Sequence, residues 1–337
     1  MEPSSQTDLV LAAQAGDQLA FETLVGLYRP ELLVHCYRML GSVHDAEDRV
    51  QESLLRAWEK RASLTNPQAY RAWLYRIATN LCLNTLARAP RRSLPSDTYP
   101  PSSPDTPLAP RQRELIWLEP FPDDLLADQQ LGPEAHAFQR ERLTLAFLVA
   151  LQYLTPVQRA VLLLREVLEW PAAEVADWLA LSVPAVNSSL QRARRALRQR
   201  YPAGEAAPAS PRAAAQDLLQ RYLALWEQAD IPGLARLLRE DAWFAMPPVP
   251  TWFQGRATVA AVLGTRIFSP GRQMLLRPTR ANGSPAFGLY QRLSGTGAYQ
   301  LMGLFVLGVV GQQVGSLVAF LDPASLGAFG FPASLPG

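Results

Sequence analysis

The sequence contains very little histidine, cysteine or lysine, and each scarcity excludes a kind of site. Three histidines and two cysteines occur among 337 residues, and no Cys/His cluster has zinc spacing, so we expect no bound metal or cofactor. Cys36 and Cys82 lie in apolar helical patterns, which favours buried free thiols over a disulfide. Lys60 is the only lysine among 32 basic residues. Because nearly every basic residue is arginine, a high arginine content is not by itself evidence for a particular function.

Long apolar segments are also missing. No run reaches the roughly 18 residues that suggest a membrane span, and the N-terminal MEPSSQTDLV lacks the basic and then apolar order of a signal peptide. We therefore expect a cytoplasmic protein that does not insert into a membrane. Hydrophobic residues make up 48% of the chain and charged residues 18%, which is ordinary for globular domains, and the length allows two or three of them.

Charge is distributed unevenly along the chain, although the net charge is only +2. Residues 61–92 contain six arginines and no acid, and residues 182–200 contain five arginines and no acid. Residues 93–139 are the reverse, with eight acids and two arginines. This order of basic, acidic and basic blocks says more about partners than the total charge does.

Periodicity and composition divide the chain into five segments. Residues 7–92 and 134–202 have apolar residues at spacings of three and four, which predicts two helical domains. Residues 93–133 are acidic and rich in proline and serine, which is typical of a linker, and residues 203–212 form a shorter one. Residues 213–337 begin with two helical patterns and continue with short apolar runs that suit strands. The expected fold is multidomain, with two all-α domains joined by a flexible linker and a C-terminal α+β domain.

The stretch DAEDRVQESLLRAW, residues 45–58, predicts a helix with two different faces. Its apolar residues recur on one side and form a core face. Its carboxylates, with that of Glu59, recur at spacings of three, four and seven on another side. The apolar face consists of Val50, Leu54, Ala57 and Trp58, and the acidic face of Asp45, Asp48, Glu52 and Glu59. The acidic face is either an ordinary solvent-exposed surface or a docking surface for a partner.

Aromatic residues are interleaved with arginines in NPQAYRAWLYRIATNLCLNTLARAPRR, residues 66–92. Such a mixture suits unpaired bases, which need a stacking surface and a positively charged track. The alternative is that these aromatics belong mostly to a core, which claims at least one of them. The residues concerned are Tyr70, Trp73 and Tyr75 with Arg71, Arg76, Arg88, Arg91 and Arg92. Asn80 adds a polar group for a base, or else is an ordinary surface amide.

Residues 170–200 have the pattern of a helix-turn-helix. A short helix carries Val175, Trp178 and Leu179 inward, Ser182 is placed to cap a second helix, and that helix repeats Val186, Leu190, Ala193 and Leu197 on its inner face. Its outer face offers short polar groups to base edges and arginines to phosphates. A solvated arginine-rich helix is the alternative.

The two helical blocks, in this order and with this linker, resemble the extracytoplasmic-function group of bacterial RNA polymerase sigma factors. DAEDRVQESLLRAW and AWLYRIATNLCLN resemble the second conserved region of that family, and LTPVQRAVLLLREVLEWPAAEVADWLALSVPAVNSSLQRARRAL resembles the fourth. The resemblance covers roughly residues 7–200. It implies that the chain binds core RNA polymerase and promoter DNA, and that it directs promoter-specific initiation of transcription.

The resemblance assigns roles to individual residues. Docking on the polymerase clamp falls on Asp45, Asp48, Gln51, Glu52, Leu55 and Arg56. Reading of the −10 element as a single strand falls on Arg61, Ser63, Asn66, Trp73, Tyr75, Arg76 and Asn80, with the loop from Arg61 to Asn66 as the base pocket. Reading of the −35 duplex falls on Asn187, Ser188, Ser189, Gln191, Arg192, Arg194 and Arg195.

The −35 segment departs from the family pattern at one place. Where the family often has basic-Ser-basic, this chain has Asn187-Ser188-Ser189. The change removes up to two phosphate or guanine contacts, which predicts weaker and less salt-sensitive −35 binding. The resemblance also implies that the acidic linker threads through the polymerase toward the RNA path. A flexible tether is the alternative and needs only the composition.

The C-terminal third resembles the SnoaL-like polyketide-cyclase cone that is fused to certain sigma factors of this group. Such a cone has an apolar pocket for an unknown small ligand between its helices and a curved sheet. Candidate lining residues are Trp226, Trp243, Phe244, Met246, Trp252 and Phe253; an ordinary core would use the same residues. Asp230 and Asp241 are carboxylates near the expected walls, with helix-end capping as their alternative role.

Catalysis by the cone is not expected, because enzymes of that fold commonly use an Asp or a His-Asp pair and residues 201–337 contain no histidine. We hypothesise instead that the cone packs on the sigma domains, near WLEPFPDDLL, residues 117–126, which resembles the linker signature of such fusions. There it would adjust promoter activity in place of a separate anti-sigma protein. Two other readings stay open at this point. One is a helix-turn-helix regulator that senses a ligand through the cone, and the other is a cyclase or hydrolase with a DNA-binding appendage.

Overall fold

The computed structural model describes residues 3–112, 117–126, 143–200, 212–293 and 297–337. The expected start of the second helical block at 134 and all but the last residue of the 203–212 linker lie outside the described residues. The chain divides into two compact units, which are Met1–Arg91 with Ala150–Arg200, and Arg92–Val149 with Tyr201–Gly337. Among the described helices none combines the length and apolar character needed to span a membrane.

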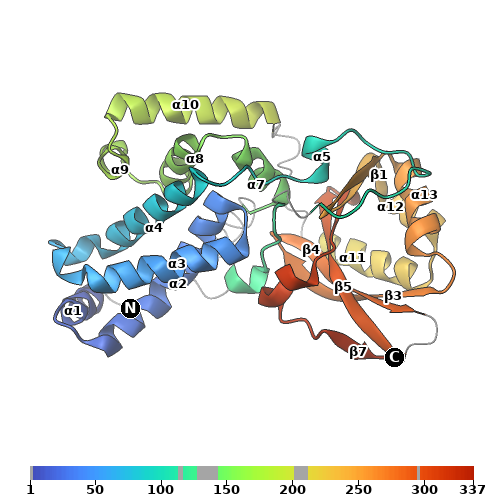
Figure 1. The fold of residues 1–337 in the computed structure, drawn as a ribbon, viewed down its shortest axis with the longest axis horizontal. Coiled ribbons are helices and arrows are strands. Elements are labelled where there is room, and N and C mark those ends of the chain that lie inside the picture. The colour runs from blue at the N-terminus through green and yellow to red at the C-terminus, as the bar shows by residue number, and fades with distance from the viewer. Residues whose placement is uncertain (1–2, 113–116, 127–142, 201–211, 294–296) are drawn as a thin grey trace. The chain divides into compact units, whose positions relative to one another are not determined.

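The first half of the first unit is helical throughout (Figure 1). Two turns set its path. Asp17 accepts the Ala20 N–H and caps one helix, while Gly41 ends the same helix at φ 72° and Ser42 caps the next. The elements are α1 (Pro3–Gln14), α2 (Gln18–Leu40), α3 (Val43–Glu59), η1 (Arg61–Ser63), η2 (Pro67–Ala69) and α4 (Tyr70–Leu86).

The second half of this unit contains the helix-turn-helix. Thr155 and Gln158 form a capping box at the start of α8, and Ala180 ends α9 in the left-handed region at φ 53°. Ser182 Oγ accepts the Ala185 N–H at 3.3 Å, as expected for the cap of the next helix. The elements are α7 (Leu145–Gln152), which begins in the other unit, α8 (Pro156–Leu162), the π-helical turn η4 (Leu163–Val167), α9 (Ala172–Leu179) and α10 (Val183–Arg200).

The core face predicted for α3 is confirmed in part. Val50 and Ala57 are buried as predicted, whereas Leu54 and Trp58 are half-buried. The other buried positions of α3 are Val43, Ala46 and Ser53. Cys36 and Cys82 are fully buried free thiols. Burial raises the pKa of the Cys82 thiol well above its usual range, which keeps it protonated and unreactive.

The second unit is built on one mixed sheet, with α11 lying across it (Figure 1). The strand order is β2-β1-β6-β5-β4-β3, with β7 on β5, and among the described strands only β1 and β6 pair in parallel. The strands are β1 (Leu238–Met246), β2 (Val249–Gln254), β3 (Arg272–Ala281), β4 (Ser284–Leu293), β5 (Ala298–Val310), β6 (Gln313–Phe320) and β7 (Ser334–Pro336). The helices are α5 (Pro95–Thr98), η3 (Asp123–Leu126), α11 (Arg212–Glu227), α12 (Ile231–Leu237), α13 (Arg256–Val262), η5 (Leu263–Ile267) and η6 (Pro323–Phe329).

Both faces of this sheet are buried, and alternate residues of β5 and β6 serve each face. Phe305 and Leu317 join the core under α11, α12 and α13, whereas Val306 and Val318 join a second core on the opposite face. Burial on both faces explains why these strands read as continuous apolar runs. The second core includes Leu94 and Leu118 from the 93–133 segment, so part of the presumed linker is packed into a domain.

Candidate functional site

The acidic face of α3 is available at the surface of the first unit. Asp48, Gln51 and Arg56 are exposed, and Leu55 keeps 56% of its accessible surface. Asp45 and Glu52 are half-buried. Glu52 accepts from Arg49 at 2.8 Å and pairs with Arg56. All six predicted docking residues therefore lie on a helix whose opposite face is core, and the side chain of Glu52 is held in place.

The loop after α3 forms one wall of a pocket of about 390 Å³. Gln14 on α1 fixes the loop by donating to the carbonyls of Arg61 and Leu64 at 3.2 and 2.6 Å. Asn66 caps η2 by accepting the Gln68 N–H at 3.0 Å. The pocket is lined by Ser63, Leu64, Thr65, Asn66, Ala69, Ala72, Trp73, Arg76 and Trp178. Four of the predicted −10 residues thus meet in one pocket.

The other three predicted −10 residues are not in this pocket. Arg61 stacks over the Trp58 ring at 4.2 Å and donates to the Trp58 carbonyl, and Asn80 is exposed farther along α4. Tyr75 is only 1% exposed, which contradicts its assignment as a base contact. Its ring packs between His35 and Trp170, and burial raises its pKa well above the usual value. The core alternative was correct for this residue.

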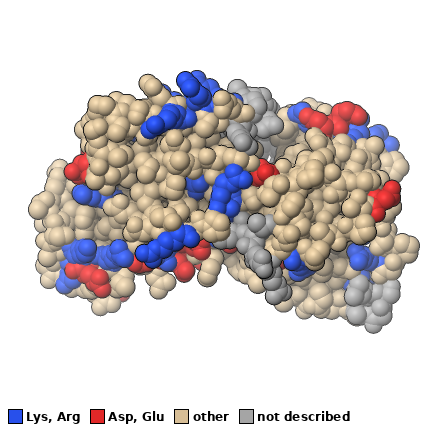
Figure 2. Space-filling model, turned by 45° about the horizontal axis from the view of Figure 1, so that its top comes forward, with Lys and Arg blue, Asp and Glu red and all other residues tan. Residues whose placement is uncertain are grey.

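The outer face of α10 carries the arginines expected for duplex DNA. Figure 2 shows basic atoms in several clusters on one face of the molecule, with acidic atoms beside some of them. Asn187, Ser188, Gln191, Arg192 and Arg195 are all exposed. Arg194 is exposed as well, but its guanidinium is paired with Glu166, at 3.0 Å from Nε to Oε1.

Ser189 contradicts the sequence interpretation, because it is only 6% exposed and lies among the inner residues of α10. Its Oγ accepts from Arg192 at 3.3 Å, so it positions an arginine instead of reaching a phosphate. Of the two positions where the family often has a basic residue, only position 187 is exposed, which limits the lost contact to one.

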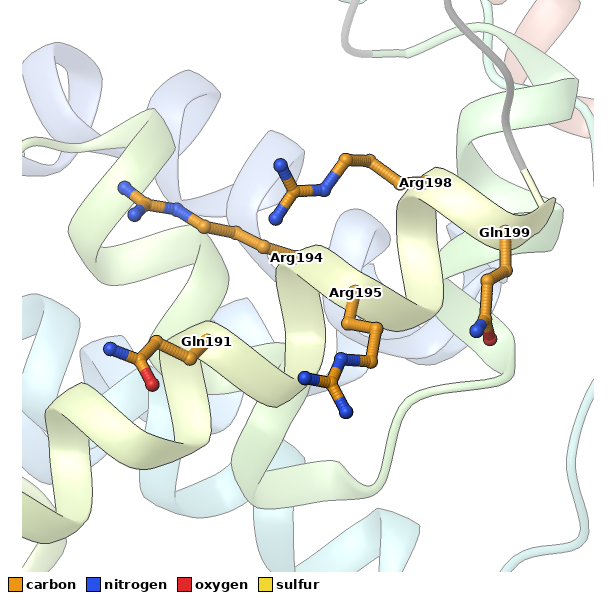
Figure 3. Close-up of a pocket in the computed structure, with 5 residues that line it drawn as sticks. All are labelled: Gln191, Arg194, Arg195, Arg198 and Gln199. Atoms are coloured by element: carbon orange, nitrogen blue, oxygen red, sulfur yellow. The ribbon is translucent and has the colours of Figure 1, made fainter.

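Sequence reasoning missed Arg198. Figure 3 shows Arg194 and Arg198 reaching in the same direction from successive turns of α10, with Gln191, Arg195 and Gln199 lining the same shallow hollow. The spacing of four residues from Arg194 was the available signal, since residues four apart share a helix face. Arg198 is exposed and extends the basic track by one turn.

The aromatic residues of the second unit do not form a single pocket wall. Trp226, Phe244, Met246 and Phe253 belong to the buried core between the helices and the sheet. Trp243 was placed wrongly, because it packs on the opposite face of the sheet, where strand alternation directs it. Trp252 is also directed elsewhere, since its Nε1–H donates to the Tyr99 carbonyl at 2.7 Å.

The two candidate carboxylates have structural partners. Asp230 caps α12 by accepting the Gly233 N–H at 2.8 Å, which is the alternative, helix-capping role considered for it from the sequence. Asp241 is bidentate with Arg239, whose hydrogen bond lowers the pKa of that carboxyl. Within the described ranges, no group of three or more His, Cys, Asp or Glu residues is placed to hold a metal ion.

The segment 117–126 is bound by the β3–β4 turn. Asn282, fully buried at φ 54°, exchanges two hydrogen bonds with Phe121, each of 2.9 Å, and donates from Nδ2 to the Leu143 carbonyl. Asp123 accepts the Gly283 N–H at 2.8 Å and pairs with Arg280 at 3.1 Å. The segment WLEPFPDDLL therefore contacts the cone, and sequence alone did not identify Asn282 as the centre of this contact. Packing of the cone on the sigma domains stays a prediction.

The earlier part of the same segment follows the free edge of β2. Ser102 and Gln112 donate their N–H groups to the carbonyls of Trp252 and Pro248, at 2.8 and 3.0 Å. Arg266 donates to the carbonyls of Pro104 and Thr106. In Figure 1 the chain that contains α5 runs past β1 toward α13. The described part of the 93–133 segment therefore packs, within the second unit, on the cone formed by residues 212–337.

Comparisons with known proteins agree with this geometry. Residues 24–92 match Sigma-70 region 2, and residues 144–197 match Sigma-70, region 4. The chain is 45% identical over 313 residues to the ECF RNA polymerase sigma factor SigG of Mycobacterium tuberculosis, which covers 91% of this chain and 83% of SigG. It is 29% identical over 184 residues to the ECF RNA polymerase sigma factor SigW of Bacillus subtilis, covering 55% of this chain and 90% of SigW.

One solved structure shares the fold over most of the chain. The crystal structure of the Mycobacterium tuberculosis extracytoplasmic function sigma factor SigJ superposes with a TM-score of 0.58 at 23% identity, covering 92% of this chain and 99% of that one. Two helical domains followed by a C-terminal α+β domain are thus confirmed as the fold. The chain belongs to the extracytoplasmic-function RNA polymerase sigma factors, which bind core polymerase and direct promoter-specific initiation of transcription.

Proposed function

We propose that the two units divide the work of this sigma factor. In the first unit, α3 docks on core polymerase, the pocket after α3 takes a base of the −10 strand, and α10 reads the −35 duplex. The exposed carboxylates and Leu55 of α3 support docking on a basic surface with an apolar contact. The exposed arginines of α10 support phosphate contacts. The chain then acts where polymerase and promoter meet, in the cytoplasm.

The second unit, the cone, regulates the first through the linker. The observation that carries this proposal is the docking of residues 93–112 and 117–126 on the cone by hydrogen bonds and by burial of Leu94 and Leu118. Burial of each leucine contributes about 1.5–3 kcal/mol. A linker held in this way is not available to enter a channel of the polymerase, so the cone controls how much linker is released. This role needs no catalysis, and the pairing of Asp230 and Asp241 with structural partners supports a non-enzymatic cone.

The test is multi-round transcription with purified core polymerase on a promoter library. The full chain is compared with a chain ending near Ala206 and with Trp252→Phe, which removes the indole N–H that donates to the Tyr99 carbonyl and keeps an aromatic ring. We expect all three to initiate at the same promoters and to differ in level, with Trp252→Phe between the other two. Equal levels from all three would refute regulation by the cone. Failure of every form to bind core would refute docking through α3.

A small ligand for the cone is favoured by one further observation. The Tyr222 hydroxyl and the Trp226 indole N–H are buried in the core under α11 and have no hydrogen-bond partner among the described residues. Buried polar atoms normally have partners, so a polar ligand atom at this place would be stabilised. Thermal shift of the full chain against Tyr222→Phe with a library of small polar aromatics tests this idea. A shift that is identical in both proteins would contradict it.

A further inference from the structure

Arg194 lies on the same side of α10 as two residues assigned to base edges. Spacings of four, three and four keep four exposed residues along one stripe of the helix, and these are Asn187, Gln191, Arg194 and Arg198. In Figure 3 the side chains of Arg194 and Arg198 extend to one side of α10, and those of Arg195 and Gln199 to the other. Arg194 is therefore placed to meet a phosphate beside the base contacts.

The guanidinium of Arg194 is already bound by a carboxylate. Glu166 Oε1 accepts from Nε of Arg194 at 3.0 Å and also from Nη2. Arg194 and Glu166 keep 49% and 31% of their side-chain surface exposed, so the pair lies at the surface of region 4. Arginine uses the same two neighbouring N–H groups to bind a phosphate. The carboxylate thus occupies the edge of Arg194 that DNA would need.

Glu166 is held beside α10 by the π-helical turn η4. Its neighbours Leu163, Leu164 and Val167 are buried, which fixes the backbone of the turn in the core. π-helical turns often occur at functional sites, because the extra residue redirects a side chain. The carboxylate can therefore leave Arg194 by rotation of its side chain, but it stays close to the surface that faces DNA.

We propose that Glu166 is a positioning residue of the −35 interface, whose carboxylate takes the place of a DNA phosphate on Arg194 and lowers the affinity of α10 for duplex DNA. When DNA binds, Arg194 exchanges one anion for another, and the released carboxylate lies near phosphates that repel it. This inference rests on the proposed −35 role of α10. It adds the residue that sets the strength of a contact that carries no sequence information.

The exchange of anions has a signature in the salt dependence of binding. An arginine that moves from water to a phosphate changes the slope of log affinity against log salt by about −0.9, because counterions leave the DNA. An arginine that moves from Glu166 to a phosphate leaves a carboxylate that attracts a cation again, so the net release is small. Arg194 should contribute little to the slope in the native chain and about −0.9 once residue 166 is neutral.

The experiment neutralises Glu166 in the full chain. Glu166→Gln keeps the size of the side chain, and Glu169→Gln makes the same charge change at an exposed residue of the same connection. Binding of a fluorescent pool of random duplexes of about 20 base pairs is measured between about 50 and 200 mM salt. We expect Glu166→Gln to bind about two- to fivefold more tightly than Glu169→Gln at the lower salt, with a slope steeper by about 0.9.

Arg194→Ala separates the exchange of anions from a purely structural role. In the Glu166→Gln chain it should remove the gain in affinity and the steeper slope, whereas in the native chain it should change both much less. If Glu166 only tied η4 to α10, Glu166→Gln would weaken binding, and that result would overturn the inference. Equal binding by Glu166→Gln and Glu169→Gln would also overturn it.

Two further readouts locate the source of a failure. If Arg195→Ala and Arg198→Ala leave the affinity and the slope unchanged, α10 does not bind duplex DNA and the proposed −35 role itself is wrong. If those two changes weaken binding while Glu166→Gln behaves like Glu169→Gln, only the role of Glu166 is wrong. Sequencing the bound duplexes should show the same preference with and without Glu166; an altered preference would mean that Glu166 faces a base and is no substitute for a phosphate.

Discussion

The two units of this sigma factor use their surfaces in opposite ways. In the first unit the residues assigned to polymerase and DNA are mostly exposed side chains on helices whose other faces are core, so the faces are visible in the spacing of the sequence. In the second unit the aromatic residues are mostly core, and the surface that stands out binds another part of the same chain. The comparison teaches that helix periodicity can predict a surface that binds an external partner, but cannot predict a surface that binds another segment of the same chain.

Reversing a charge on α3 should have the largest effect on the external side of this comparison. Asp48→Arg presents a positive charge to a basic partner, and like charges facing each other cost several kcal/mol. We expect binding of core polymerase to weaken about a hundredfold, measured by competition with a labelled sigma factor. Glu22→Arg, an exposed change of the same kind on α2, should leave binding unchanged. Equal loss from both variants would show a general charge effect and no docking face.

Removing the Asn282 side chain should have the largest effect on the internal side. Asn282→Ala leaves the Phe121 N–H and the Leu143 carbonyl without their buried partner. We expect a loss of about 2–3 kcal/mol in unfolding free energy and faster hydrogen exchange in residues 93–112 and 117–126. Asn282→Gly serves as the control, because it tolerates the positive φ and isolates the loss of the hydrogen bonds. Unchanged exchange in both variants would mean that the turn does not hold the linker.

Acid should weaken the first unit through His35. Burial, and then the nearby Arg38 and Arg71, lower the pKa of His35 to about 3. The unfolded chain takes up the proton near pH 6.5 and the folded one does not, so stability is present above pH 6.5 and is lost as the pH falls below it. Between pH 7 and pH 5 the unfolding free energy should fall about 2 kcal/mol more in the native chain than in His35→Gln. Parallel pH profiles for the two proteins would contradict this assignment.

The smallest effect concerns the exposed arginines of α10, which are Arg192, Arg194, Arg195 and Arg198. Arg198→Ala should reduce the slope of log affinity against log salt by about 1 on a −35 duplex, as expected for one lost phosphate contact. Arg194→Ala should reduce it less, because Arg194 has to leave Glu166 before it meets DNA. Gln199→Ala, a neutral neighbour on the same hollow, is the control and should not change the slope. A larger effect from Arg194→Ala than from Arg198→Ala would reverse this ranking.

The errors of the sequence interpretation have a common physical cause. Tyr75 is buried because its ring packs against Trp170. Ser189 is buried because it lies among the inner residues of α10. The local spacing along each helix did not reveal either contact. Trp243 was assigned to the wrong side of a sheet because both of its faces are apolar, so strand alternation gives no polar side to orient it. Arg198 was within reach of the spacing argument and was missed.

By itself, the sequence determined the helical domains, the core and exposed faces of α3 and α10, and the family, since all of these follow from residue spacing along one helix or from motifs in one segment. The tertiary structure decided which partner each remaining surface has. Only folding brings Asn282 to Phe121 and Trp178 to the loop after α3. Contacts between segments more than a hundred residues apart leave no period in the sequence, because each segment satisfies its own local pattern whether or not the other is present.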